Sequence, residues 1–125
     1  MSSQQLQSEV EALRREGYSI EIVTEGKWDL VIIRQYAVKA GYSKQITDLL
    51  IKAPQSYPNG KLDMFWTDKD LLLANGKVPE KANNIANHNG KEWRRFSWHP
   101  KSWNPGRDNL KTYLEFINAR FDKEC

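Results

Sequence analysis

The stretch QITDLLIKAPQSYPNGKLDMFWTD, residues 45–68, contains two segments rich in β-branched and aromatic residues, with a turn between them. The first segment predicts a strand that stops at Pro54, because proline cannot donate a hydrogen bond to a neighbouring strand. In the turn SYPNG, Pro58 presets a turn dihedral and Gly60 tolerates a positive φ. The second segment, KLDMFWTD, predicts another strand. The two strands are therefore expected to be antiparallel neighbours.

The residues that precede this pair extend the pattern toward the N-terminus. Residues 18–26 and 28–38 read as two more strands, and the turn EGKW between them predicts a hairpin. Residues 3–16 carry one apolar stripe at helical spacing, and Gly17 follows where a helix usually ends. The predicted core positions in this half are Leu6, Val10, Leu13, Ile20, Ile22, Val31 and Ile33.

The residues that follow the pair change character twice. Residues 68–91 have the Asn, Gly and Pro content of irregular backbone, and a loop of this length is typical of a functional segment. A second helix is expected after the N-cap Asp108. Its apolar stripe consists of Leu110, Tyr113, Leu114, Ile117 and Phe121. The order of elements predicts an α+β domain: N-terminal helix, four-stranded antiparallel meander, long loop, C-terminal helix.

The composition limits the classes of function open to the chain. It has 125 residues, of which 39% are hydrophobic and 28% are charged, which suits one domain over residues 1–125. No apolar run approaches the roughly 20 residues of a membrane-spanning helix. The N-terminus also lacks the basic-then-apolar order of a signal peptide. We therefore expect a cytoplasmic protein without a membrane partner.

Metal and cofactor chemistry find little support in the sequence. The single cysteine, Cys125, excludes an internal disulfide and a thiolate-rich metal site, and as the last residue it is a poor nucleophile. His88 and His99 are the only histidines, and neither has a carboxylate or thiolate at ligand spacing. Glycine-rich phosphate loops are absent. We expect no metal and no cofactor.

The segment EWRRFSWHPKSWNPGRDNL, residues 92–110, holds three of the five tryptophans, and residues 91–107 carry five basic side chains against one acidic. Aromatic and cationic side chains together suit a stacking platform for single-stranded nucleic acid. Trp93, Trp98 and Trp103, however, recur at intervals of five, which fits neither one face of a strand nor one face of a helix. Nucleic-acid binding is therefore the less favoured interpretation.

The same segment offers a reaction centre at Ser97-Trp98-His99. In an extended strand the side chains of Ser97 and His99 share one face. A serine hydroxyl becomes a useful nucleophile when a base takes its proton, and histidine titrates in the right range. A purely structural role for the pair remains the alternative, because Ser-x-His arises often by chance.

The layout resembles the ubiquitin-conjugating enzyme (UBC) fold, in which a helix and a four-stranded meander lead into the active site. That family carries a tyrosine-proline pair before its fourth strand, which matches Tyr57-Pro58. It also carries tryptophan, a small polar residue and proline ahead of a helix, which matches Trp103, Asn104 and Pro105. The order and approximate spacing of these parts agree over nearly the whole chain.

Two segments, Trp93 to His99 and Trp103 to Thr112, are similar to a bacterial UBC-like family encoded beside ubiquitin-like proteins, activating enzymes and deconjugating peptidases. The resemblance implies a ubiquitin-like protein and an activating-type enzyme as partners, and a role in defence against phage. The usual catalytic cysteine is missing ahead of Trp103, and Ser97 lies close to its expected place. The family's His-Pro-Asn triplet is matched only in part, by His88 and Asn89.

These comparisons lead to the hypothesis that Ser97 accepts a ubiquitin-like C-terminus as an oxyester, with His99 as general base and Asn89 as an oxyanion donor. Six further residues are expected to contact partners, the last two by docking an activating enzyme: Arg94, Arg95, Trp98, Trp103, Arg14 and Arg15. Two alternatives stay open, a catalytically inactive adaptor that binds a ubiquitin-like protein and a single-stranded nucleic-acid binding module.

Overall fold

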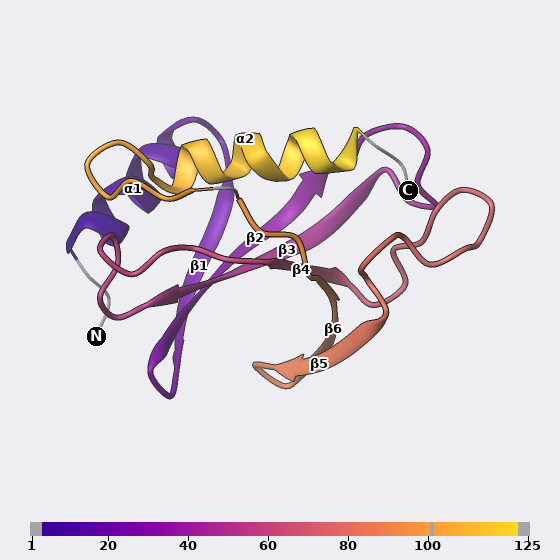
Figure 1. Cartoon of the computed structure of the whole chain (residues 1–125), viewed down its shortest axis with the longest axis horizontal. Coiled ribbons are helices and arrows are strands. Elements are labelled where there is room, and N and C mark those ends of the chain that lie inside the picture. The colour runs from indigo at the N-terminus through magenta and orange to yellow at the C-terminus, as the bar shows by residue number, and fades with distance from the viewer. Residues whose placement is uncertain (1–3, 101, 123–125) are drawn as a thin grey trace.

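The structure is a computed structural model that describes residues 4–100 and 102–122 (Figure 1). Its elements are α1 (Gln4–Arg15), β1 (Ser19–Glu25), β2 (Trp28–Ala37), β3 (Ile46–Pro54), β4 (Phe65–Asp68), β5 (Asn84–His88), β6 (Lys91–Phe96) and α2 (Leu110–Phe121). The strands form one antiparallel sheet in the order β1-β2-β3-β4-β6-β5. The predicted α+β class with a helix at each end of an antiparallel sheet is confirmed.

The first half of the fold follows the sequence pattern closely. Helix α1 buries its predicted stripe and ends before Gly17, which has a φ of 108°. Strands β1 and β2 form the predicted hairpin, with Glu25 paired to Trp28 and Gly26 at a φ of 61° in the turn. The predicted core residues of this half are buried, except that Ile22 is partly buried against the core.

The expected fourth strand is shorter than predicted. Strand β4 begins at Phe65, because Met64 has a φ of 58° and so leaves the extended conformation. Gly60 is not among the described residues with a positive φ, which corrects the expectation for the turn. A Cβ at Gly60 would instead lie 2.8 Å from the Pro54 ring, so glycine is needed there for close packing.

The prediction of an irregular stretch over residues 68–91 was wrong for its second half. Strands β5 and β6 form a hairpin across the turn Asn89-Gly90, where both residues have a positive φ, of 51° and 75°. Asn-Gly is the strongest short hairpin signal because both residues tolerate this conformation. The described sheet therefore has six strands, and β6 lies between β4 and β5.

Helix α2 buries all five residues of its predicted stripe. Its N-cap is Asn109, not Asp108 as predicted. The Asn109 side chain accepts a hydrogen bond from the Thr112 amide, and the Thr112 hydroxyl accepts one from the Asn109 amide, which makes a capping box. Asp108 lies one residue earlier, where its carboxylate accepts a hydrogen bond from the Asn104 amide.

The sheet has an apolar cluster on each face. Both helices cover one face and share its large core (Figure 1). The opposite face, called the open face here, has a smaller cluster made of Leu30, Ile32, Leu50, Trp66 and Trp93. No helix covers this second cluster in the part of the chain that the structure describes. Neither α1 nor α2 has the length and apolar character needed to cross a membrane.

Candidate active site

The open face carries a hollow of about 440 Å³. It lies on this face because Trp66 belongs to the small cluster there, and Met64 and Ala86 pack against that cluster. The hollow is lined by Trp28, Lys52, Lys61, Asp63, Met64, Trp66, Ala86, His88 and Arg95. Three lysine and arginine side chains and one carboxylate thus surround an apolar floor, which makes the hollow cationic.

The turns of two hairpins meet beside the hollow. His88 Nδ1 donates to Glu25 Oε1 at 2.9 Å, and the Asn89 amide donates to Glu25 Oε2 at 2.9 Å. The hydrogen bond from His88 and that from Asn89 lower the pKa of Glu25. The two edge strands β1 and β5 are therefore joined at one end by these hydrogen bonds.

Ser97 follows directly after β6 at the border of the hollow. Arg95 lines the hollow, and its Nε donates to the Ser97 hydroxyl at 3.1 Å. The Ser97 amide donates to the Lys81 carbonyl at 2.9 Å, and the residue is half-buried. The hydroxyl is thus placed beside a guanidinium, a group that stabilises negative charge on oxygen.

His99 is held by a carboxylate that the sequence analysis missed. Its Nδ1 donates to Oδ1 of Asp63 at 2.5 Å, and Asp63 also lines the hollow. Because Asp63 accepts this hydrogen bond, the other ring nitrogen, Nε2, is the proton acceptor of the neutral imidazole. A carboxylate on Nδ1 and a free Nε2 is the arrangement that orients a general-base histidine. Asp63 is 36 residues from His99, and no local pattern marks the pair.

Ser97 and His99 are close in sequence but have different partners. Trp98 packs against the large core on the helix side, so its two neighbours belong to the opposite side by alternation. Among the described residues, the Ser97 hydroxyl bonds to Arg95 and the His99 ring to Asp63, with no hydrogen bond between the two. The four residues therefore form two hydrogen-bonded pairs, Asp63–His99 and Arg95–Ser97, called the two linked pairs here. One member of each pair, Asp63 and Arg95, lines the hollow.

Comparison with known families decides the kinship of this chain. The model of prokaryotic E2 family E matches residues 5–124, which is nearly the full length. The chain belongs to prokaryotic E2 family E. Searches of curated proteins and of solved structures returned no match.

Membership in prokaryotic E2 family E places the chain in ubiquitin-like conjugation, as a transferase of the conjugating type. The family works with a ubiquitin-like protein and an E1-type activating enzyme. The only cysteine, Cys125, lies outside the described residues, so the expectation about its role is not addressed by the structure. The hydroxyl nucleophiles between Gly90 and Trp103 are Ser97 and Ser102.

In this member of prokaryotic E2 family E, the tryptophans of the basic segment are anchors. Trp93 is buried in the small cluster, and its Nε1 donates to the His88 carbonyl. Trp98 donates to the Glu80 carbonyl, and Arg120 lies over its ring at 3.6 Å. Trp103 donates to the Pro58 carbonyl at 2.7 Å. Their spread over separate contacts gives no support to the stacking platform for nucleic acid.

Arg94 is also tied to the E2-family fold itself. Its Nε donates to the Lys69 carbonyl at 3.0 Å and its Nη1 to the Ala82 carbonyl at 2.7 Å. Burial lowers the pKa of Arg94. These bonds hold both ends of the segment between β4 and β5. The predicted partner contacts of Arg94, Trp98 and Trp103 stay predictions, but each side chain has a structural role.

Asn89 is not brought together with Ser97 in this E2-family chain. Asn89 lies in the turn before β6, and Ser97 follows the last residue of that strand. The six residues of β6 lie between them, and these alone span about 20 Å at roughly 3.3 Å per residue. A contact of Asn89 with an acyl group on Ser97 is therefore not supported by its position.

The two arginines at the end of α1 differ in their surroundings. Arg14 Nε and Nη2 both donate to the Ile20 carbonyl, and Nη1 pairs with Glu11. This side chain therefore ties α1 to β1. Arg15 is exposed, and among the described residues no ion pair involves it. Of the two, Arg15 is the better candidate for docking an activating enzyme, and both assignments stay predictions.

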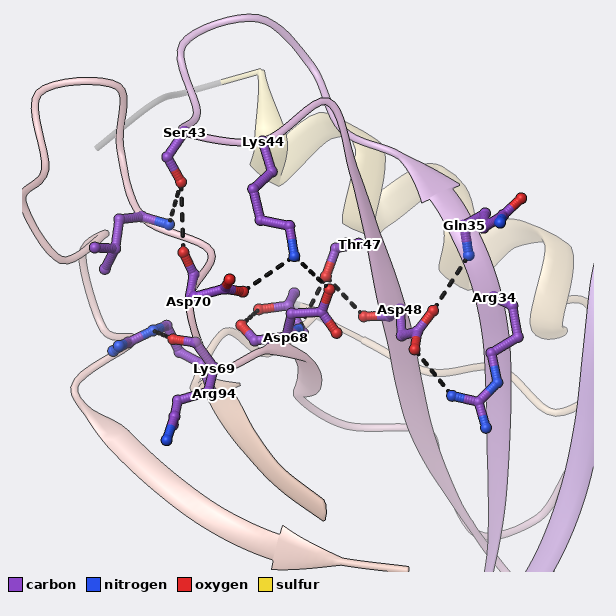
Figure 2. Close-up of polar contacts among 12 residues, drawn as sticks. Arg34, Gln35, Ser43, Lys44, Thr47, Asp48, Asp68, Lys69, Asp70 and Arg94 are labelled. Carbon is purple, nitrogen blue, oxygen red and sulfur yellow. Dashed lines mark hydrogen bonds and ion pairs between the residues drawn. The ribbon is translucent and has the colours of Figure 1, made fainter.

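A network of ion pairs crosses the open face on the far side of the small cluster. Lys44 Nζ lies between the carboxylates of Asp68 and Asp70, at 2.8 Å and 3.0 Å (Figure 2). Lys91 Nζ joins Asp68 to Asp48 at 2.8 Å and 3.1 Å, and Asp48 also pairs with Arg34 at 2.9 Å. The cations at this end of the face are thus neutralised by carboxylates.

Proposed function

We propose that this chain is a conjugating enzyme that carries the C-terminus of a ubiquitin-like protein as an oxyester on Ser97. The observation that supports the proposal best is the contact of His99 Nδ1 with Asp63, which prepares a general base two residues beyond Ser97. Arg95 on the Ser97 hydroxyl adds a cation at the oxygen that would react. Ser97 is also only half-buried, and its hydroxyl contacts Arg95, a residue that lines the hollow.

The loading step follows from these positions. The Ser97 Oγ attacks the carbonyl carbon of a thioester that the activating enzyme carries, and His99 Nε2 takes the hydroxyl proton. The new C–O bond forms as the C–S bond breaks, and the proton passes from His99 to the departing thiolate. In this step the Ser97 Oγ exchanges its hydrogen bond with Arg95 for one with His99.

The negative charge that develops on the carbonyl oxygen needs a donor near Ser97. Arg95 is the charged donor nearest to the hydroxyl, because its Nε already contacts Oγ. Asn89 is too far along β6 to serve. We therefore assign to Arg95 the stabilising role first expected of Asn89.

The test is a reconstituted loading assay with activating enzyme, ubiquitin-like protein and ATP. The wild-type chain should gain one acyl adduct that hydroxylamine and mild base cleave. Ser97→Ala should give none, and Ser97→Cys should give an adduct that thiols cleave. Ser102→Ala is the matched control, because Ser102 is exposed and lies outside the two linked pairs. An adduct on Ser97→Ala at the wild-type level would reject the assignment.

A second candidate function is a catalytically inactive adaptor that binds a ubiquitin-like protein. The observation that favours it is the hydrogen bond of Ser97 Oγ to Arg95 in place of His99. An adaptor would show no covalent mass shift after incubation with the activated ubiquitin-like protein. An affinity column that carries the adaptor would nevertheless retain the ubiquitin-like protein. Intact-mass spectrometry separates the two functions.

The pathway that we propose for the chain is defence against phage. The support is the resemblance to bacterial UBC-like proteins that are encoded beside ubiquitin-like proteins and activating enzymes. No single residue indicates a role in defence. Cells that express the complete operon with Ser97→Ala should lose protection in a plaque assay, whereas Ser102→Ala should retain it. Equal protection by both variants would contradict a role of the oxyester in defence.

A further inference from the structure

We propose that the hollow on the open face binds a mononucleotide, with its phosphate on Lys52, Lys61 and Arg95 and its base against Trp28. This function goes beyond the proposed acyl transfer, because it involves no covalent step at Ser97. The observations that carry it are the cations of the hollow, two of them without an ion pair among the described residues, the exposed indole, the unpaired Trp66 donor, the size of the hollow and the carboxylates near it.

The cations of the open face divide into two groups. Lys44, Lys91 and Arg34 are each paired with carboxylates at 2.8 to 3.1 Å. Lys52 and Arg95 have no ion pair among the described residues, and Lys61 reaches Asp63 only at 4.0 Å. These three cations line the hollow together. An anion is therefore the ligand that would neutralise this end of the face.

Trp28 supplies a flat apolar surface at the same place. Its side chain is 41% exposed, although large aromatic side chains usually bury most of their area. Lys52 Nζ lies 4.7 Å from the Trp28 ring centroid and 5.5 Å from that of Trp66. A cation beside an exposed indole suits a ligand that has both a phosphate and an aromatic ring, because every base can stack.

Trp66, one of the residues that line the hollow, has a buried donor without an acceptor among the described residues. Trp66 is 4% exposed and lines the hollow, and its Nε1 has no hydrogen-bond partner among the described residues. A buried donor of this kind is uncommon, because leaving it unpaired is unfavourable. A small movement of the indole toward a polar ligand would satisfy it.

The size of the hollow and the carboxylates near it favour a single nucleotide over a single-stranded nucleic acid. Its volume of about 440 Å³ lies within the range of small-molecule sites, about 300–1,000 Å³. Asp63 lines the hollow and Glu25 contacts His88, another lining residue, so a nucleic-acid strand longer than one nucleotide would meet two carboxylates here. Repulsion there would oppose a polyanion more strongly than a single phosphate, because a polyanion brings more negative charges close to these carboxylates.

The experiment is isothermal titration calorimetry of the full chain with AMP, adenosine and inorganic phosphate. AMP should bind at least tenfold more tightly than adenosine or phosphate, because only AMP has both parts. Lys52→Gln and Trp28→Ala should each weaken AMP binding at least fivefold, and Trp28→Phe should restore most of it. Lys77→Gln, an exposed lysine outside the hollow, is the matched control and should bind as the wild type does.

The proposal is overturned by no binding of AMP to the wild type at millimolar concentration, or by unchanged affinity of the Lys52→Gln variant. A dT₁₀ or rU₁₀ oligonucleotide that binds more than tenfold more tightly than AMP also overturns it, in favour of a single-strand site. Ser97→Ala should bind AMP normally, so a failure of the loading assay and a failure of nucleotide binding are separable.

Discussion

Glu25 and His88 are 63 residues apart in sequence, yet Glu25 Oε1 accepts a hydrogen bond from His88 Nδ1 at 2.9 Å. The two residues belong to the opposite edge strands of the sheet, β1 and β5. The contact is reinforced by the Asn89 amide on the second carboxylate oxygen. Figure 1 shows the two hairpin turns on the same side of the molecule, away from the helices. Because His88 also lines the hollow, this junction holds one of its walls.

Removing the Glu25 carboxylate should loosen this junction. In Glu25→Ala the Asn89 amide loses its acceptor, so we expect its hydrogen exchange to accelerate at least tenfold. Amide exchange measured by NMR checks this. Glu21→Ala, another exposed glutamate of β1 that pairs with Arg34, should leave Asn89 unchanged. Equal acceleration of Asn89 amide exchange in both variants would contradict this prediction. It would show that the general stability of β1, and not the Glu25 contact, protects the Asn89 amide.

Asp63 should matter for loading through His99. In Asp63→Asn the charged acceptor on Nδ1 is lost but the His99 base remains, so we expect the rate of adduct formation to fall about tenfold to a hundredfold, which is less than the roughly 10²- to 10⁴-fold of a whole general base. Single-turnover loading over pH 6 to 9 checks this, because a base effect changes the pH profile of the rate. Lys61→Gln removes the neighbour of Asp63 without touching His99 and should keep the wild-type profile.

Asp68 should contribute more to stability than Asp70, although both accept a hydrogen bond from Lys44. The Asp68 side chain is 17% exposed and that of Asp70 is 73% exposed. We expect Asp68→Asn to lower the free energy of unfolding by about 1.5–3 kcal/mol, the range for hydrogen bonds to charged groups. Asp70→Asn should cost less than about 1 kcal/mol. Urea unfolding at pH 7 measures both.

The contacts of Asp68 with Lys44 and Lys91 make the free energy of unfolding depend on pH, and the direction of this dependence follows from the pKa of Asp68. Burial raises the pKa of Asp68, but the hydrogen bonds from Lys44 and Lys91 outweigh it, so the pKa lies below the ordinary value of 3.8. A lowered folded-state pKa means that the stabilisation is complete above pH 3.8 and is lost as the pH falls through the folded-state value. The difference in stability between wild type and Asp68→Asn should therefore shrink in unfolding experiments as the pH falls below 3.8.

Gly60→Ala should destabilise the fold for lack of space. The added Cβ would lie 2.3 Å from the Ser56 hydroxyl, which can move away, and 2.8 Å from the Pro54 ring, which is rigid. We expect a loss of about 1–3 kcal/mol in thermal or urea unfolding. Ser56→Ala should relieve it only in part. Gly106→Ala meets Asn104 at 3.4 Å and should be nearly neutral.

The parts of the fold that follow local periodicity were predictable from the sequence. The stripe of α2 and the alternation of β1 identify one buried face each. The open-face cluster was not predicted, although β2 is apolar at consecutive positions, from Leu30 to Ile33, which is typical of a strand buried on both faces. The β5–β6 hairpin was missed because its Asn-Gly turn lies in a polar stretch without alternating apolar residues.

The candidate site was predictable only where its residues are sequence neighbours. Ser97 and His99 follow from their spacing, and Arg95 is also a sequence neighbour of Ser97, whereas Asp63 is 36 residues from His99 and meets it only because the chain that enters β4 lies beside the chain that leaves β6. The Asn89 assignment relied on a motif matched in part, and the turn places this residue at the wrong end of β6. The hollow is lined by residues from β2, β3, β4, β5 and β6, and the contact of its residue His88 with Glu25 spans 63 residues, so no local pattern predicts it.

Arg94 fixes residues 69–82 to the sheet at both ends, although the composition of this segment is typical of a linker. One guanidinium holds the carbonyls at both ends, Lys69 and Ala82, and the Ser97 amide holds that of Lys81. A protease that cuts the exposed turn at Asn75-Gly76 should therefore release nothing. The nicked halves would co-elute on a native gel-filtration column, and the protein could be expressed as two complementing fragments.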